Sequence, residues 1–253
     1  MMNEYYQDCE CEHEETVDLA DGDKKPVYVQ DANYKELVEQ ALQEVYNEPT
    51  AMNAILLDLT KNALERAVVA SFVSDSLLKT SLMNSAAFFA AAKTERQVKD
   101  LASLIVDEKG VRRSFGAFKK LSSTVIKNYN SDWLRTEYVA SVRTARMASL
   151  WAVAQQSADV YPNIEYVRSR AAEPRKKHLT LVGMVRPIND PIWQKYLPPN
   201  DWGCLCGFRV TDKEVTELPD PMPVIPLAFQ NNAGITGELF TKDHPYFQLV
   251  GSN

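Results

Sequence analysis

Prolines divide this sequence into two parts that cannot fold in the same way. Eleven of the thirteen prolines lie beyond residue 160, and none occurs between Thr50 and Tyr161. Proline lacks a backbone donor and clashes with the preceding helical turn, so helix interiors exclude it. Long helices are therefore expected only in the proline-free stretch, and short elements and loops in the remainder.

The proline-free stretch has the apolar spacing of helices nearly throughout. Leu37, Ala41 and Val45 follow at four-residue steps, which places their side chains on one face of a helix. One face of a longer helix is traced by Leu134, Tyr138, Val142, Ala145, Ala148 and Ala152. We expect a mostly α-helical body over residues 34–130, continued by this long helix.

Capping signals predict where helices in this body begin and end. Thr94 and Gln97 have the spacing of a capping box, which predicts a helix beginning there. Pro49 suits the first turn of a helix, and Gly110 suits the end of one.

Residues 1–33 are polar and strongly acidic, so they bury too little apolar surface to offset the entropy of ordering. We expect a flexible arm that orders only on a partner. Cys9, Cys11 and His13 lie within it and could together bind a metal, but we favour chance spacing in a polar segment.

The overall charge argues against a protein whose whole surface binds nucleic acid. The formal net charge is -6, whereas such domains are usually strongly basic. Candidate contacts for DNA or an acidic partner are Arg112, Arg113, Lys119, Lys120, Arg175, Lys176 and Lys177. The alternative interpretation is that these are ordinary solvated cations, and spacing alone does not decide between the two.

Hydrophobicity predicts neither a membrane span nor a signal peptide. No run approaches the ~18 consecutive apolar residues that cross a bilayer, and the first residues lack a basic and then apolar pattern. We expect a soluble protein that is intracellular when made. The cysteines form two Cys-x-Cys pairs, unlike the spread framework of a secreted disulfide-rich domain.

Beyond residue 159 the pattern changes from helical to short and irregular. Residues 164–169 and 206–211 alternate as strands do. The sequence therefore predicts an α+β protein, in which the helical body precedes a small, loop-rich α+β domain over residues 131–253.

One motif in this second part carries most of the functional information. It runs from a histidine through a glycine turn, an Asp-Pro-x-Trp step and a Pro-Pro-Asn-x-Trp turn to a Cys-x-Cys pair. Its residues are His178, Gly183, Asp190, Pro191, Trp193, Pro198, Pro199, Asn200, Trp202, Gly203, Cys204 and Cys206. We interpret Trp193 and Trp202 as structural anchors, with one exposed on a partner as the alternative.

This order of residues resembles the phage Mu F-like head morphogenesis family. The resemblance covers roughly residues 130–212, including Thr136 and Glu137 in the preceding helix. It implies a minor head protein of a tailed phage or prophage that acts in head assembly at the portal vertex and in DNA packaging or retention. Where the family usually has arginine between the cysteines, this chain has Leu205, which puts any role of a charge there in doubt.

The histidine and cysteines of the motif are also candidate metal ligands. His178, Cys204 and Cys206, with His244 returning as a fourth ligand, would make the Cys2His2 set of closed zinc sites. Cys-x-Cys spacing is tighter than in ordinary zinc knuckles, and a disulfide across it would be strained. Buried thiols that pack as small apolar groups are the remaining interpretation.

The resemblance implies binding rather than catalysis, and we assign no catalytic residue. The expected partners are the portal protein, other head proteins and packaged double-stranded DNA bound without sequence specificity, with no membrane and no small-molecule substrate. The expected location is the virion, in the head interior or at the portal vertex. The alternative is a zinc-dependent nuclease or injected effector built on His178, Cys204, Cys206 and His244.

Overall fold

The structure, a computed structural model, describes residues 33–171 and 173–249. Apart from Asn33, the predicted acidic arm lies outside the described residues, together with Cys9, Cys11 and His13. The helical part consists of α2 (Tyr34–Asn47), α3 (Ala54–Val69), α4 (Ser76–Ala102), α5 (Phe115–Lys127), the π-helical turn η2 (Asn128–Asp132) and α6 (Trp133–Gln156). Helix α3 packs against both α4 and α6.

Short polar side chains begin three of these helices by accepting backbone N–H groups of the first turn. Asn53 accepts from Leu56 at 3.0 Å at the start of α3, and Asp75 caps α4 in the same way. The prediction that a helix begins at Thr94 is wrong, because α4 runs through it without interruption. The prediction for Pro49 is also wrong, since α3 begins at Ala54.

Apolar faces of α3, α4 and α6 form the main core. Its helical members are Ala63, Leu64, Val68, Leu82, Ala86, Phe89, Ala92, Trp133, Leu134, Ala140, Ala145 and Ala148. The alanines on α4 and α6 let both of these helices pack closely against α3. A second cluster joins α2, α5 and the end of α4, around Val45, Leu101 and Phe118. Among the described residues, no helix is both long and apolar enough to cross a membrane.

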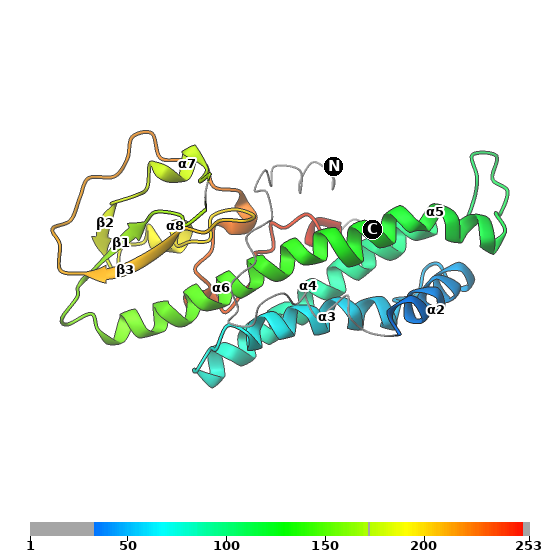
Figure 1. The fold of residues 1–253 in the computed structure, drawn as a ribbon, viewed down its shortest axis with the longest axis horizontal. Coiled ribbons are helices and arrows are strands. Elements are labelled where there is room, and N and C mark those ends of the chain that lie inside the picture. The colour runs from blue at the N-terminus through cyan, green and yellow to red at the C-terminus, as the bar shows by residue number, and fades with distance from the viewer. Residues whose placement is uncertain (1–32, 172, 250–253) are drawn as a thin grey trace.

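A small antiparallel sheet follows the helices and lies at one end of the molecule (Figure 1). Its strands are β1 (Asn163–Val167), β2 (Val185–Pro187) and β3 (Gly207–Thr211), in the order β2-β1-β3. Ile164 pairs with Arg186 on one side and Val210 on the other. The two predicted strands are confirmed, whereas the three-residue β2 is too short to show a period-two pattern.

Short helices complete this α+β part, which confirms the predicted fold class. They are α7 (Lys176–Leu179), α8 (Trp193–Tyr196), the 3-10 turns η3 (Leu227–Phe229) and η4 (Phe247–Leu249), and α9 (Ala233–Thr236). The core beside the sheet is formed by Trp151, Ala154, Ile164, Tyr166, Leu181, Met184, Ile188, Trp193, Leu197, Cys204 and Cys206.

The chain returns from the sheet to the helices in its last part. Residues 217–224, which we call the linker, have no helix or strand. Residues 225–247, which we call the strap, then lie along the helical body (Figure 1). The strap contributes Phe229, Leu239, Phe240 and Tyr246 to the main core, so that core joins segments far apart in the sequence.

Candidate metal centre and motif region

His178 is presented by the short helix α7 and is only 2% exposed. The chain turns directly after it, with the Leu181 amide donating to the His178 carbonyl at 3.2 Å. Gly183 then adopts a φ of +84°, a left-handed conformation that glycine accommodates without strain. Its amide donates to the Tyr166 carbonyl, which ties this turn to β1.

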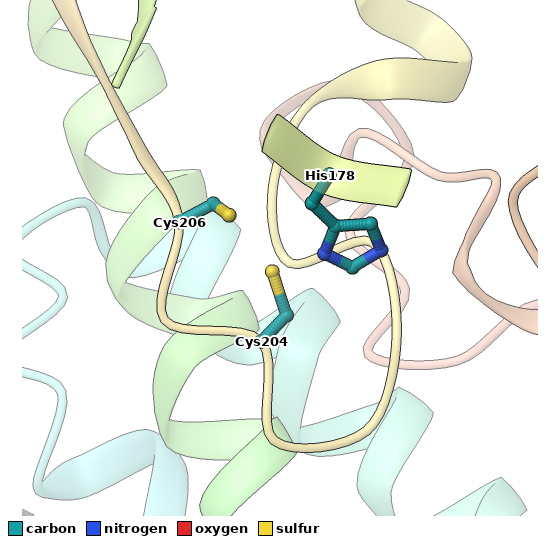
Figure 2. A group of neighbouring side chains, drawn as sticks. All are labelled: His178, Cys204 and Cys206. Atoms are coloured by element: carbon teal, nitrogen blue, oxygen red, sulfur yellow. The ribbon is translucent and has the colours of Figure 1, made fainter. Parts of the chain in front are cut away.

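Cys204 and Cys206 lie in the loop just before β3, and both are free thiols and buried. The ligand atoms of His178, Cys204 and Cys206 all lie within 4.8 Å of one another. Figure 2 shows the two sulfur atoms and the imidazole ring grouped together, with one ring nitrogen facing the sulfur of Cys204. Two soft thiols and an imidazole converging in this way could hold a metal ion.

The two thiols differ in acidity because they share one hydrogen bond. That bond and burial raise the pKa of Cys204. The same hydrogen bond lowers the pKa of Cys206. Hydrogen bonds from the Tyr166 hydroxyl and the Ser169 backbone lower this pKa further, and burial partly raises it. Cys206 is therefore the thiol that more readily supplies the thiolate a metal requires.

A buried tyrosine and asparagine support the cysteine loop. The Tyr166 hydroxyl donates to Asn200 Oδ1 at 2.7 Å, and neither residue is exposed. Asn200 Nδ2 donates in turn to the Leu197 carbonyl at 3.2 Å across Pro198–Pro199. The Pro-Pro-Asn turn is thus held against β1. Sequence reasoning missed Tyr166, whose signal was its place in the middle of a predicted strand.

Asp201 links the lead into α7 with the cysteine loop. Its carboxylate is nearly buried and accepts from Arg175, and from Lys177 at 2.8 Å. Arg175 also donates to the Trp202 carbonyl at 2.9 Å. These charge-assisted bonds fix His178 relative to the cysteines, although Asp201 was not among the residues singled out from the sequence.

Trp193 is anchored by polar and apolar contacts together. It is 1% exposed and its Nε1 donates to the Pro187 carbonyl at 2.9 Å. Asp190 accepts from the Ile192 amide at 2.9 Å and from Arg186 at 2.7 Å, which shapes the turn into α8. The Asp-Pro-x-Trp step therefore builds a turn with a buried indole on it.

A family profile described as "Phage Mu protein F like protein" matches residues 89–209, the range that holds this geometry. These residues, just under half of the chain, are therefore similar to the phage Mu F-like protein family. It is 28% identical over 176 residues to "Mu-like prophage FluMu F protein" of Haemophilus influenzae, covering 69% of this chain. It is 38% identical over 76 residues, 30% of this chain, to "Putative capsid assembly protein F" of Escherichia phage Mu.

These relatives are much longer than the matched part of this chain. The aligned residues span 36% of the Haemophilus influenzae protein and 17% of the phage Mu protein. No solved structure matches the chain.

His244, the predicted fourth ligand, lies beyond the matched Mu F-like range and away from the thiols. It is not among the ligand atoms that converge with His178. Its ring instead contacts Phe89, Trp202 and Tyr246, at centroid distances of 4.8, 6.0 and 4.7 Å. Burial, and then the charge of Lys93, holds the pKa of His244 well below its usual range. The structure therefore brings together three of the four predicted ligands.

A buried ion pair in the Mu F-like range was missed by sequence reasoning. Lys93 Nζ on α4 lies 2.5 Å from Glu137 Oε2 on α6, and neither side chain is exposed. Burial lowers the pKa of Lys93, and Glu137 partly counters this. The other Glu137 oxygen accepts from the Tyr246 hydroxyl at 3.2 Å. The two partners are far apart in sequence, so spacing carried no signal for this pair.

Most of the predicted basic contact residues make intramolecular interactions. Arg112 stacks over the Tyr46 ring at 4.3 Å, and Arg113 donates to the Leu104 carbonyl at 3.0 Å. Lys119 pairs with Glu39 at 2.6 Å. As described above, Arg175 and Lys177 hold Asp201. Lys120 and Lys176 are exposed.

Proposed function

We propose that this protein acts in the assembly of a tailed-phage head, as a minor head component at the portal vertex. The match of residues 89–209 to the Mu F-like profile supports this, and the phage Mu relative is named for capsid assembly. Because the match spans only part of that relative, the role is carried over as a proposal. In this proposal the protein is made in the bacterial cytoplasm and ends in the virion.

The single observation that carries the proposal is that the motif residues fold together within the matched range. His178 and the Cys-x-Cys pair converge, Trp193 is buried in the same core as the cysteines, and Trp202 is buried where this region meets the helical core. Their burial suits the task of holding a docking surface in shape, which supports binding rather than enzymatic turnover.

Exposed apolar side chains on this region offer a direct test of docking. Leu179 and Val182 flank the turn after His178 and are 36% and 39% exposed. We expect the tagged chain to co-purify with the portal protein of the same phage, and L179R with V182R to reduce this recovery at least tenfold. A matched pair on the helical body, L77R with F88R, should leave recovery unchanged, since these exposed residues lie outside the motif region.

Two results would remove support for portal docking by this surface. One is failure of the wild-type chain to recover the portal protein. The other is equal loss in both pairs of variants while circular dichroism shows that all of them are folded.

We also propose that the converging group binds zinc as a structural ion. The donor set of one imidazole and two thiols fits zinc, and a metal would stabilise a region with few regular elements. The residues that would hold it are His178, Cys204 and Cys206. When bound, zinc would cross-link α7 to the cysteine loop.

Metal analysis of the purified chain tests this. We expect about one zinc per chain, lost in C206S and retained in H244Q, because the latter side chain lies in the aromatic cluster. Replacing both Cys9 and Cys11 by serine is the matched thiol control and should retain zinc. A metal-free chain that stays folded in the presence of added zinc would contradict the proposal.

Packaged double-stranded DNA is a further proposed partner, bound without sequence specificity. Exposed Lys120 and Lys176 support it, and surface pairs such as Lys119 with Glu39 can exchange for phosphate at little cost. Binding should weaken steeply with added salt and fall in K120A with K176A. Affinity that does not depend on salt, or no binding at low salt, would count against this partner.

A further inference from the structure

The strap fills a groove whose walls come from two different parts of the molecule. On the helical side, the Phe89 ring lies 4.5 Å from Phe240 and 5.4 Å from Tyr246, centroid to centroid. On the motif side, Trp202 lies 4.8 Å from Phe229 and 5.6 Å from Phe240. Without the strap, the Phe89 and Trp202 rings would lose these contacts and face solvent.

Polar contacts make this groove selective for the strap. At its floor, Glu137 is paired with Lys93 and uses its second oxygen to accept from the Tyr246 hydroxyl at 3.2 Å. At its rim, Ser85 Oγ accepts from the Leu239 amide at 2.9 Å. A segment that fits must therefore present aromatic rings, a phenol donor and a free amide at the strap's own spacing.

The strap is joined to the sheet by a mostly exposed linker that is held near its end, where the Tyr196 hydroxyl donates to the Pro223 carbonyl at 3.3 Å. Five of the eight linker residues are exposed, and Thr216 just before it is held to β2 through the Val185 amide and carbonyl. Fully extended, eight residues reach about 27 Å. The helices within the strap have three or four residues each, so its order comes mainly from the groove.

We propose that the strap exchanges between two copies of this chain, each groove receiving the strap of the other. The groove's one occupant in the structure is this segment, so the strap of a second copy makes the same contacts with no new surface required. Exchange changes the path of the linker, with its Tyr196–Pro223 hydrogen bond, and the loop-closure entropy, which makes it a low-cost route to a dimer at high local concentration. This inference does not depend on the proposed role in head assembly.

The first experiment asks whether the groove of the full-length chain opens to a strap supplied from outside. The probe is a fluorescent synthetic peptide of residues 225–248, followed by anisotropy. We expect saturable binding, and about tenfold weaker binding of the same peptide carrying Y246F, because Glu137 then loses a buried donor. No saturable binding by the wild-type chain would overturn the proposal.

The second experiment locks the native strap in place. S85C with L239C joins α4 to the strap at the contact described above, and the reduced form of the same protein is its control. Oxidation of S85C with L239C to the disulfide, which we call the lock, should reduce peptide binding at least tenfold, and reduction of the disulfide should restore binding. Oxidised wild-type chain controls for the native cysteines, and equal peptide binding by locked and reduced forms would overturn the proposal.

Light scattering of the wild-type chain over a concentration series tests exchange without any variant. We expect a dimer that grows with concentration, and no dimer from protein whose lock was oxidised while dilute and monomeric. A chain that stays monomeric up to millimolar concentration, or a dimer that forms from monomer locked in this way, would show that straps are not exchanged.

Discussion

The helical body and the motif region are stabilised in different ways. The helices satisfy their backbone groups internally, begin at capping side chains and bury alternating alanines and larger apolar residues. The motif region has short strands and four-residue helices, so side chains take over: Trp193, Asn200 and Asp201 all bond to backbone or to neighbouring side chains. The same chain thus relies on periodic packing in one part and individual anchors in the other.

This difference teaches where single substitutions should matter most. In the helices, the apolar contacts are spread over many residues, and one exposed change is tolerated. In the motif region and along the strap, a single side chain often stabilises a whole turn. Its loss should therefore destabilise neighbouring residues as well.

Loss of the Trp202 side chain should have the largest effect. The indole is 2% exposed and packs on Phe229, Phe240 and His244 where the two parts meet. We expect W202A to lower the free energy of unfolding by about 3–5 kcal/mol, measured by urea denaturation. F88A removes an aromatic ring that is 73% exposed and should change it by less than ~0.5 kcal/mol. Equal losses in free energy of unfolding for W202A and F88A would contradict the view that buried anchors matter more than exposed side chains.

Breaking the buried ion pair should have the next largest effect. E137Q leaves the Lys93 ammonium without its countercharge in a fully buried site, so we expect a loss of about 3 kcal/mol in the free energy of unfolding. The double variant K93M with E137L removes both charges and should lose less than E137Q alone. The single variants K93M and E137L complete the comparison. If the loss in free energy of unfolding of the double variant equals the sum of the losses of these two, the charges do not stabilise each other.

Acidification should weaken the strap through His244. Burial lowers the pKa of His244 in the folded chain, so below about pH 6.5 the unfolded chain binds a proton that the folded chain does not. The free energy of unfolding should therefore fall as the pH drops below 6.5, by up to ~1.4 kcal/mol per pH unit.

The matched variant for this prediction is H244F, which keeps an aromatic ring in the cluster but cannot titrate. Its free energy of unfolding should fall less between pH 6.5 and 5 than that of the wild-type chain. Parallel curves for the two proteins would show that His244 does not carry the dependence.

The exposed ion pair between α2 and α5 should have the smallest effect. Lys119 and Glu39 side chains are 46% and 57% exposed, so water and salt screen their attraction. We expect K119A to change the free energy of unfolding by less than ~1 kcal/mol, with the difference vanishing in high salt. A larger loss would mean that exposed contacts stabilise the helical body more than its packing indicates.

The sequence predicts the helical body well because periodicity is a local signal that repeats over many residues. The α4 boundary was wrong because Thr94 and Gln97 are buried inside the helix, where Gln97 donates to Asn130 instead of capping. A four-residue motif cannot distinguish a helix start from a helix interior, because tertiary burial, here with Asn130 of η2 as the partner of Gln97, decides between them.

The candidate metal centre was predictable in part for the same reason. Cys204 and Cys206 are neighbours in sequence, and the family resemblance brought His178 with them. The position of His244 depends on how the strap crosses the helices, and the Lys93–Glu137 pair depends on how α4 lies beside α6. No spacing along the chain records either arrangement. The linker sets that path, and its prolines indicate only that it is not helical.

Quantitative mass spectrometry of purified procapsids and virions tests the central claim most directly. If the compact motif region serves head assembly, peptides of this chain should be present in both particles, at low copy relative to the major capsid protein. Consistent absence of the chain from both particles, while it is abundant in the infected cell, would contradict the account.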